Sequence, residues 1–118
     1  MESMEIAKTI QEQLFGTMDP SVIFSWGISG FAAVDNDTME KLGIDNSLGG
    51  LLFNVNGHHH KGEVIVSLNH LDYYDVFICN ISKENQTNAI KDMQKNLCFY
   101  EFGDWIDKQI EYIDEYKR

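Results

Sequence analysis

The dipeptide Asn56–Gly57 constrains the fold of this chain more than any other feature of its sequence. Both central residues of a type I′ turn need a positive φ, and Asn followed by Gly meets this need best. Apolar residues recur at every second position on either side of the dipeptide, which is the period of a β-strand with one buried face. We therefore predict a hairpin with a two-residue turn. The pairs that it predicts are Val55 with His58, Phe53 with His60 and Leu51 with Gly62.

A second hairpin is predicted directly after the first. A loop over residues 69–73 keeps the apolar side chains of both flanking strands on one face of the sheet. The pairs that this loop predicts are Leu68 with Tyr74, Val66 with Val76 and Val64 with Ile78. The reverse face of the hairpin is not wholly polar. Its apolar residues are Ile65, Phe77, Cys79 and Ile81.

Helices are predicted at both ends of the chain. Apolar residues at helical spacing favour a first helix over residues 3–15 and a last, amphipathic helix with acidic residues on its outer side. The apolar stripe of the last helix is Phe99, Phe102, Ile106, Ile110 and Ile113. Strands are expected at residues 22–26, 31–35 and 88–93, and a short helical turn at residues 38–42.

This order of elements predicts one α+β domain, because 118 residues do not comfortably hold two cores. We expect an N-terminal helix, an antiparallel sheet of about five to six strands in hairpins and a C-terminal amphipathic helix. The helices are expected on one face of the sheet.

The charge of the chain excludes several classes of partner. Asp and Glu number 19 against 9 Lys and Arg, which gives a net charge of −10. Because the cations are few and scattered, we expect no direct contact with nucleic acid or with anionic membranes. The N-terminus lacks the basic and apolar regions of a secretory signal, and no apolar run is long enough to span a membrane. We therefore expect a cytoplasmic protein with reduced cysteines.

Three short motifs resemble a known group of proteins. They are Ser25-Trp26-Gly27, the hairpin segment Gly50 to Gly57 and the segment Asp72 to Val76. The chain resembles a group of short proteins of no known activity from Bacteroides-type gut bacteria and their phages or mobile elements. The resemblance implies the fold and a phage or mobile-element origin. It implies no reaction, no cofactor and no catalytic residue, since the motifs are structural.

Three consecutive histidines, residues 58–60, are the candidates for metal binding. Imidazole is the commonest side-chain ligand of transition metals. Side chains alternate along a strand, so only His58 and His60 would share a face. A structural site needs about four ligands and a catalytic site about three. We therefore expect no metal site and no cofactor.

The loop from His70 to Asp75 is the candidate for catalysis. It combines a histidine with carboxylates, which can act as general acid and base. Asn and Asp are equally expected in a hairpin loop because they suit turn geometry. Since no nucleophile or oxyanion hole accompanies the loop, we expect no enzyme activity. The alternative is a small enzyme, or a ligand- or metal-binding domain, that uses His58, His60 and this loop.

The reverse face of the second hairpin is the predicted interface. If both helices cover the other face, Ile65, Phe77, Cys79 and Ile81 remain exposed, which monomers rarely tolerate in a contiguous patch. The alternative is that the first hairpin or a loop folds over these residues. We predict a small acidic protein-interaction module without catalytic activity that binds a partner protein or a second copy of itself. A third hypothesis is that the acidic outer face of the last helix imitates nucleic acid.

Overall fold

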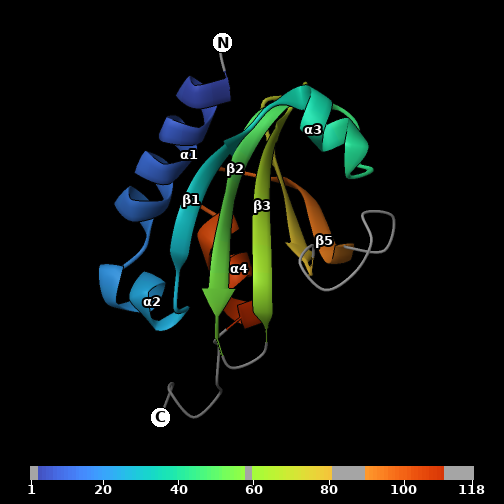
Figure 1. The fold of residues 1–118 in the computed structure, drawn as a ribbon. Helices are drawn as coiled ribbons and strands as arrows, with labels where there is room; N and C mark the ends of the chain where they lie inside the picture. Colours follow the sequence, from blue (N-terminus) through green and yellow to red (C-terminus); the bar gives the residue numbers. More distant parts are fainter. Residues whose placement is uncertain (1–2, 58–59, 81–89, 111–118) are drawn as a thin grey trace.

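The computed structural model describes residues 3–57, 60–80 and 90–110 and shows an α+β fold (Figure 1). Five antiparallel strands form one sheet in the order β1-β2-β3-β4-β5, so each strand pairs with its neighbours in the sequence. The elements are α1 (Ser3–Thr17), α2 (Pro20–Ser25), β1 (Ser29–Val34), α3 (Asn36–Lys41), β2 (Ser47–Asn56), β3 (Lys61–Asn69), β4 (Tyr74–Cys79), β5 (Ile90–Leu97) and α4 (Phe102–Ile110). The predicted fold class is confirmed.

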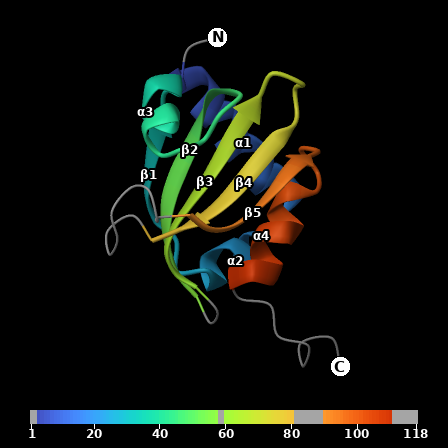
Figure 2. The same cartoon turned by 90° about the vertical axis from the view of Figure 1, so that its right-hand side faces the viewer.

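The main core lies between one face of the sheet and the helices α1, α2 and α4. Figure 2 shows α1 behind the sheet and α3 in front of it. Apolar side chains at helical spacing on α1 and α4 meet alternate residues of the strands, as the sequence pattern predicts. The residues of this core without any exposed surface are Ile10, Leu14, Ile23, Trp26, Phe53, Val64, Val66, Val76, Phe102, Ile106 and Ile110.

The first hairpin has the predicted faces but a different register. Phe53 pairs with Val64 and Val55 with Gly62, and the last pair is Asn56 with Lys61. The paired part of the hairpin therefore ends at Asn56 and Lys61, and the Gly57 N–H donates to the His60 carbonyl at 3.0 Å. The predicted two-residue turn is wrong. The observed register pairs Phe53 with Val64, both fully buried, where the turn would have placed His60 opposite Phe53, and so it keeps a polar imidazole out of this buried pair.

The second hairpin is confirmed in full. Leu68 pairs with Tyr74, Val66 with Val76 and Val64 with Ile78. The Asn69 N–H donates to the Tyr73 carbonyl at 2.9 Å and closes the loop between β3 and β4.

The segment expected as a strand at residues 22–26 is instead part of α2. The Asp19 carboxylate accepts a hydrogen bond from the Ser21 N–H at 2.9 Å, and Pro20 occupies the first turn. Proline suits the first helical position because its fixed φ fits the helix and its missing N–H has no partner there. This start signal outweighs the β propensity of the apolar residues that follow.

The predicted interface is wrong, because the chain itself covers the reverse face of the sheet. Ile65, Phe77 and Cys79 are at most 3% exposed and form a second core. The residues packed with them from β1, α3 and the segment after α3 are Val34, Met39, Leu42 and Ile44. Ile81 lies outside the described residues. The alternative, in which another part of the chain folds over this face, is the one that the structure supports.

The remaining elements differ from prediction mainly at their ends. α3 begins two residues earlier than expected, because the Asp35 carboxylate accepts from the Thr38 N–H at 2.8 Å and caps it. β5 starts within the predicted last strand and runs on to Leu97. Phe99 precedes α4 and is half exposed, while Ile113 lies outside the described residues. Among the helices of the described residues, none combines the length and the apolar character needed to cross a membrane.

Candidate functional site

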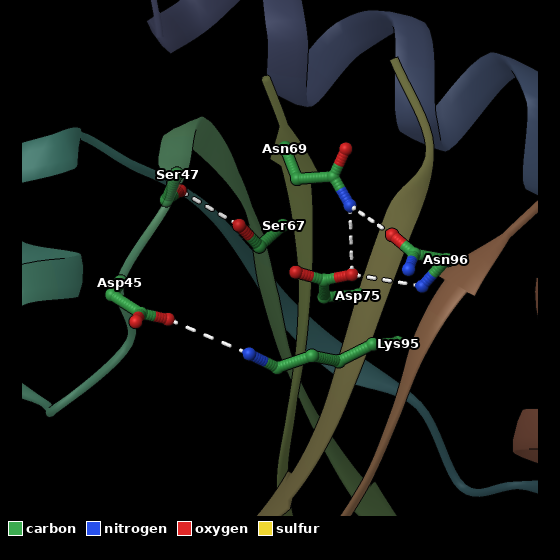
Figure 3. Close-up of polar contacts among 7 residues, drawn as sticks. All are labelled: Asp45, Ser47, Ser67, Asn69, Asp75, Lys95 and Asn96. Carbon is green, nitrogen blue, oxygen red and sulfur yellow. Dashed lines mark hydrogen bonds and ion pairs between the residues drawn. The ribbon is translucent and has the colours of Figure 1, made fainter. Parts of the chain in front are cut away.

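A buried polar network joins the ends of β3, β4 and β5 (Figure 3). Asn69 and Asp75 are at most 2% exposed. One oxygen of the Asp75 carboxylate accepts from Asn69 Nδ2 at 2.9 Å and from the Asn96 N–H at 2.9 Å. Asn69 Nδ2 also donates to Asn96 Oδ1 at 2.8 Å. Since a buried carboxylate is costly without donors, these bonds hold the three strand ends in one arrangement.

The network also fixes the loop between β3 and β4. Asn69 Oδ1 accepts from the N–H groups of Leu71 and Tyr73, at 2.9 and 3.1 Å. Asp72 at the tip of the loop and Asn96 near the end of β5 have positive φ angles of 69° and 60°. Asp and Asn adopt this conformation more readily than most residues do. Loop 70–73 is therefore anchored directly to Asn69, and the connection 98–101 follows a strand whose end is bonded to the same network.

These two segments and α1 enclose a hollow of about 240 Å³, which we call the aromatic hollow. Four of the eight residues that line it are aromatic. The lining residues are Gln13, Leu68, Asp72, Tyr73, Tyr74, Cys98, Phe99 and Tyr100.

The rim of the hollow is unusually apolar for an exposed surface. Among the lining residues, Tyr73 is 41% exposed, Phe99 50% and Tyr100 62%. The rings of Phe99 and Tyr100 meet edge to face, with their centroids 5.4 Å apart. Gathered groups of exposed large apolar side chains are typical of binding surfaces, and loops held by a rigid scaffold commonly carry them.

The floor of the hollow is fixed by Tyr74. Its hydroxyl hydrogen-bonds with Gln13 Oε1 of α1, and its ring packs on Phe102 with centroids 5.1 Å apart. Burial raises the pKa of Tyr74 to about 12, and the nearby charge of Asp72 acts in the same direction. The Tyr74 phenol is therefore neutral at physiological pH.

Asp72 contributes a carboxylate to the lining of the hollow, and Glu101 directly follows the lining residue Tyr100 in the chain. Glu101 Oε1 accepts from the Cys98 N–H at 2.9 Å, and this bond holds the pKa of Glu101 below its usual value. The hydrogen bond with Cys98 raises the pKa of Tyr100, and the charges of Cys98 and Glu101 add to that effect. The hollow thus presents the neutral phenols of Tyr74 and Tyr100 beside the carboxylate of Asp72.

A larger cleft of about 380 Å³ lies between α1 and β1. Its walls are mostly aliphatic, and they include Met4, Ala7, Ala32 and Ala33. The pairing of β1 with β2 is interrupted by a bulge between Ser29 and Ala32, a device that blunts edge strands against further pairing. Because it lacks the clustered exposed aromatic residues of the hollow, we regard this cleft as the weaker candidate.

The structure separates the histidines that the sequence offered as one site. His60 Nε2 lies 3.4 Å from the Glu63 carbonyl oxygen at the first residues of β3, and His58 lies outside the described residues. His70 is exposed and follows the last residue of β3. Nine residues of strand, about 30 Å, separate the two ends. No group of three His, Cys, Asp or Glu side chains that could hold a metal occurs among the described residues.

The loop from His70 to Asp75 does not assemble an acid–base pair around these two residues. Asp75 is buried and bonded to Asn69 and Asn96, whereas His70 is exposed. The loop instead contributes Asp72, Tyr73 and Tyr74 to the aromatic hollow.

The acidic face of the last helix is only partly described. Asp104 is exposed, but Asp107 Oδ1 accepts from Trp26 Nε1 at 2.8 Å and so links α4 to α2. Glu111, Asp114 and Glu115 lie outside the described residues.

Sequence reasoning missed the exposed half of the hollow. Phe99 was assigned to the core stripe of the last helix, and Tyr100 was not singled out. The adjacent aromatic pairs Tyr73–Tyr74 and Phe99–Tyr100 carried a usable signal. In extended backbone two successive side chains point to opposite faces, so one ring of the Tyr73–Tyr74 pair is expected outside the core. The Phe99–Tyr100 pair lies in a turn, and both of its rings are exposed.

Comparison with protein-family models, with curated proteins and with solved structures gives no match to this chain. The resemblance to short proteins of gut bacteria and their phages therefore stays a prediction.

Proposed function

We propose that this chain is a small non-catalytic module that binds a partner protein through the aromatic hollow and its rim. One observation carries the proposal: three exposed aromatic side chains from two separate loops, Tyr73, Phe99 and Tyr100, line a single hollow. Aromatic residues, tyrosine above all, supply much of the binding energy at protein interfaces.

The anchoring of the loops supports this proposal. Loop 70–73 is held by hydrogen bonds to Asn69, and β5 is joined to the same network just before the connection 98–101. A surface that is already ordered loses little conformational entropy when it binds, so more of the contact energy remains as affinity. The buried network would serve to hold these segments ready for a partner.

The charge of the chain favours a different protein over a second copy. Two copies with a net charge of −10 each repel one another, while a basic partner is attracted and steered toward the surface. The cytoplasmic location and the accessory role in a phage or mobile element, which the sequence and its resemblance suggest, belong to this proposal.

The enzyme alternative needs His58, His60 and the His70–Asp75 loop to work together. His60 and His70 flank opposite ends of β3, so this alternative lacks the convergence that acid–base catalysis requires. The nucleic-acid mimic would use the acidic residues of α4, such as Asp104, and not the aromatic lining of the hollow. A captured partner whose binding does not depend on Phe99 and Tyr100 would favour it.

The test is affinity capture with wild type and the double variant Phe99→Glu, Tyr100→Glu as baits. The matched control is Phe24→Glu, because Phe24 is 66% exposed but lies on α2, outside the hollow. A captured protein is then purified and its Kd measured against all three. We expect the double variant to weaken binding at least about a hundredfold, the effect of two hot-spot residues, and the control to leave it unchanged. Equal binding by all three, or no partner at all, would overturn the proposal.

A further inference from the structure

We infer that the aromatic hollow accepts an arginine side chain of the partner protein. This inference rests on the proposed function and names the chemistry that the hollow recognises.

The walls of the hollow suit a cation. Tyr73, Phe99 and Tyr100 form the exposed part of its lining, and Tyr74 closes its floor. The face of an aromatic ring carries partial negative charge and attracts a cation placed over it. None of the described residues that line the hollow is Lys or Arg, so no cation of its own lining competes for these rings.

Carboxylates stand beside the rings. Asp72 is part of the lining, and its negative charge helps to raise the pKa of Tyr74. Glu101 follows Tyr100 directly and is anchored to the Cys98 N–H. A guest in the hollow would meet aromatic faces and the negative charge of Asp72 together.

The size of the hollow indicates one side chain rather than a larger ligand. Its volume of about 240 Å³ lies below the range of about 300–1,000 Å³ that is typical of pockets for drug-sized ligands. Arginine fits this setting better than lysine does. Its planar guanidinium group stacks on aromatic rings and donates paired hydrogen bonds to a carboxylate, whereas an ammonium group is more strongly hydrated.

The experiment uses three capped tripeptides, in which arginine, citrulline or lysine stands between two glycines. Citrulline has nearly the shape of arginine without its charge. Each peptide is titrated into the full chain, and the amide and aromatic resonances are followed by NMR. We expect the arginine peptide to shift resonances of Tyr73, Phe99 and Tyr100 and to bind at least about fivefold more tightly than the citrulline peptide, as a partly desolvated cation–π contact provides.

Two variants test whether the preference for arginine over citrulline depends on the carboxylate of Asp72. Asp72→Asn removes one carboxylate and keeps a residue that tolerates the positive φ of position 72, so the loop conformation is preserved. Asp37→Asn removes one charge from an exposed position on α3, outside the hollow. We expect Asp72→Asn to reduce the preference for arginine over citrulline about threefold and Asp37→Asn to leave it unchanged.

Several outcomes would overturn the inference. Equal binding of arginine and citrulline, binding of neither, or shifts confined to other parts of the chain would each do so. If the partner captured above still depended on Phe99 and Tyr100, the proposed function would stand while the arginine inference failed. Loss of that dependence as well would overturn both.

Discussion

Replacing Asn69 by aspartate tests the buried network that positions both loops of the hollow. The new side chain has nearly the same size, and its oxygens can still accept from the N–H groups of Leu71 and Tyr73. The two donated bonds are lost. The Nδ2 contacts of 2.9 Å with Asp75 and 2.8 Å with Asn96 become contacts between oxygen atoms, one of them between two carboxylates.

The cost follows from the protonation that this contact forces. Two carboxylates this close cannot both ionise, so the introduced group takes up a proton in the folded state. With a pKa of about 3.9 in the unfolded chain, protonating it at pH 7 costs about 4 kcal/mol. The new O–H replaces the bond to Asp75 but not the bond to Asn96, which adds about 1 kcal/mol. A chain of 118 residues typically has a free energy of unfolding of about 6–18 kcal/mol. The expected loss of about 5 kcal/mol is a large part of this value.

The loss should depend on pH in a defined direction. Because the pKa of the introduced group is raised on folding, the folded variant binds more protons than its unfolded state. The free energy of unfolding therefore falls as the pH rises from the unfolded pKa through the folded one. At pH 5.5 the protonation cost is only about 2 kcal/mol, so the total loss should shrink to about 3 kcal/mol.

Urea unfolding followed by the fluorescence of the buried Trp26 would measure both values. Asn36→Asp is the control, because it makes the same change of charge at an exposed position at the start of α3. A loss below about 1 kcal/mol at pH 7, within the usual range for surface substitutions, would refute the role given to the network. A loss that does not change with pH would refute the protonation argument.

Three further outcomes are expected. Phe77→Glu should prevent stable folding, because it places a carboxylate in the core beneath α3. Truncation of a buried phenylalanine to alanine alone costs about 3–5 kcal/mol. A melting temperature near that of wild type would contradict this expectation. Iodoacetamide should modify Cys98 in the native protein and Cys79 only after unfolding, since burial raises the pKa of Cys79 to about 12. Equal rates of modification of the two cysteines, measured by mass spectrometry, would contradict the burial of Cys79. Gly50→Ala should lower the denaturation midpoint strongly, because a Cβ there collides with a backbone oxygen of β3, while Gly16→Ala has open space and should not.

The sequence alone predicted which side chains of the two central hairpins share a face. A two-residue period decides which side chains share a face, and this held for both central hairpins even where the register did not. A shift by an even number of residues leaves the faces unchanged. The pattern alone therefore could not choose between a two-residue turn at Asn56–Gly57 and the observed register, in which the last pair is Asn56 with Lys61. The helical spacing on α1 and α4 likewise identified their buried stripes, because each stripe is a local property of one segment.

Only the tertiary structure decided what covers each surface. The cluster of Ile65, Phe77 and Cys79 is an exposed patch or a core depending on where α3 packs. The aromatic hollow joins Tyr73 to Tyr100 across 27 positions of sequence, and it exists because Asn69 and Asn96 meet at one buried carboxylate. Local patterns report the preferences of a segment for backbone shape and burial. They do not report which distant segment supplies the burial, because that choice depends on the packing of the whole chain.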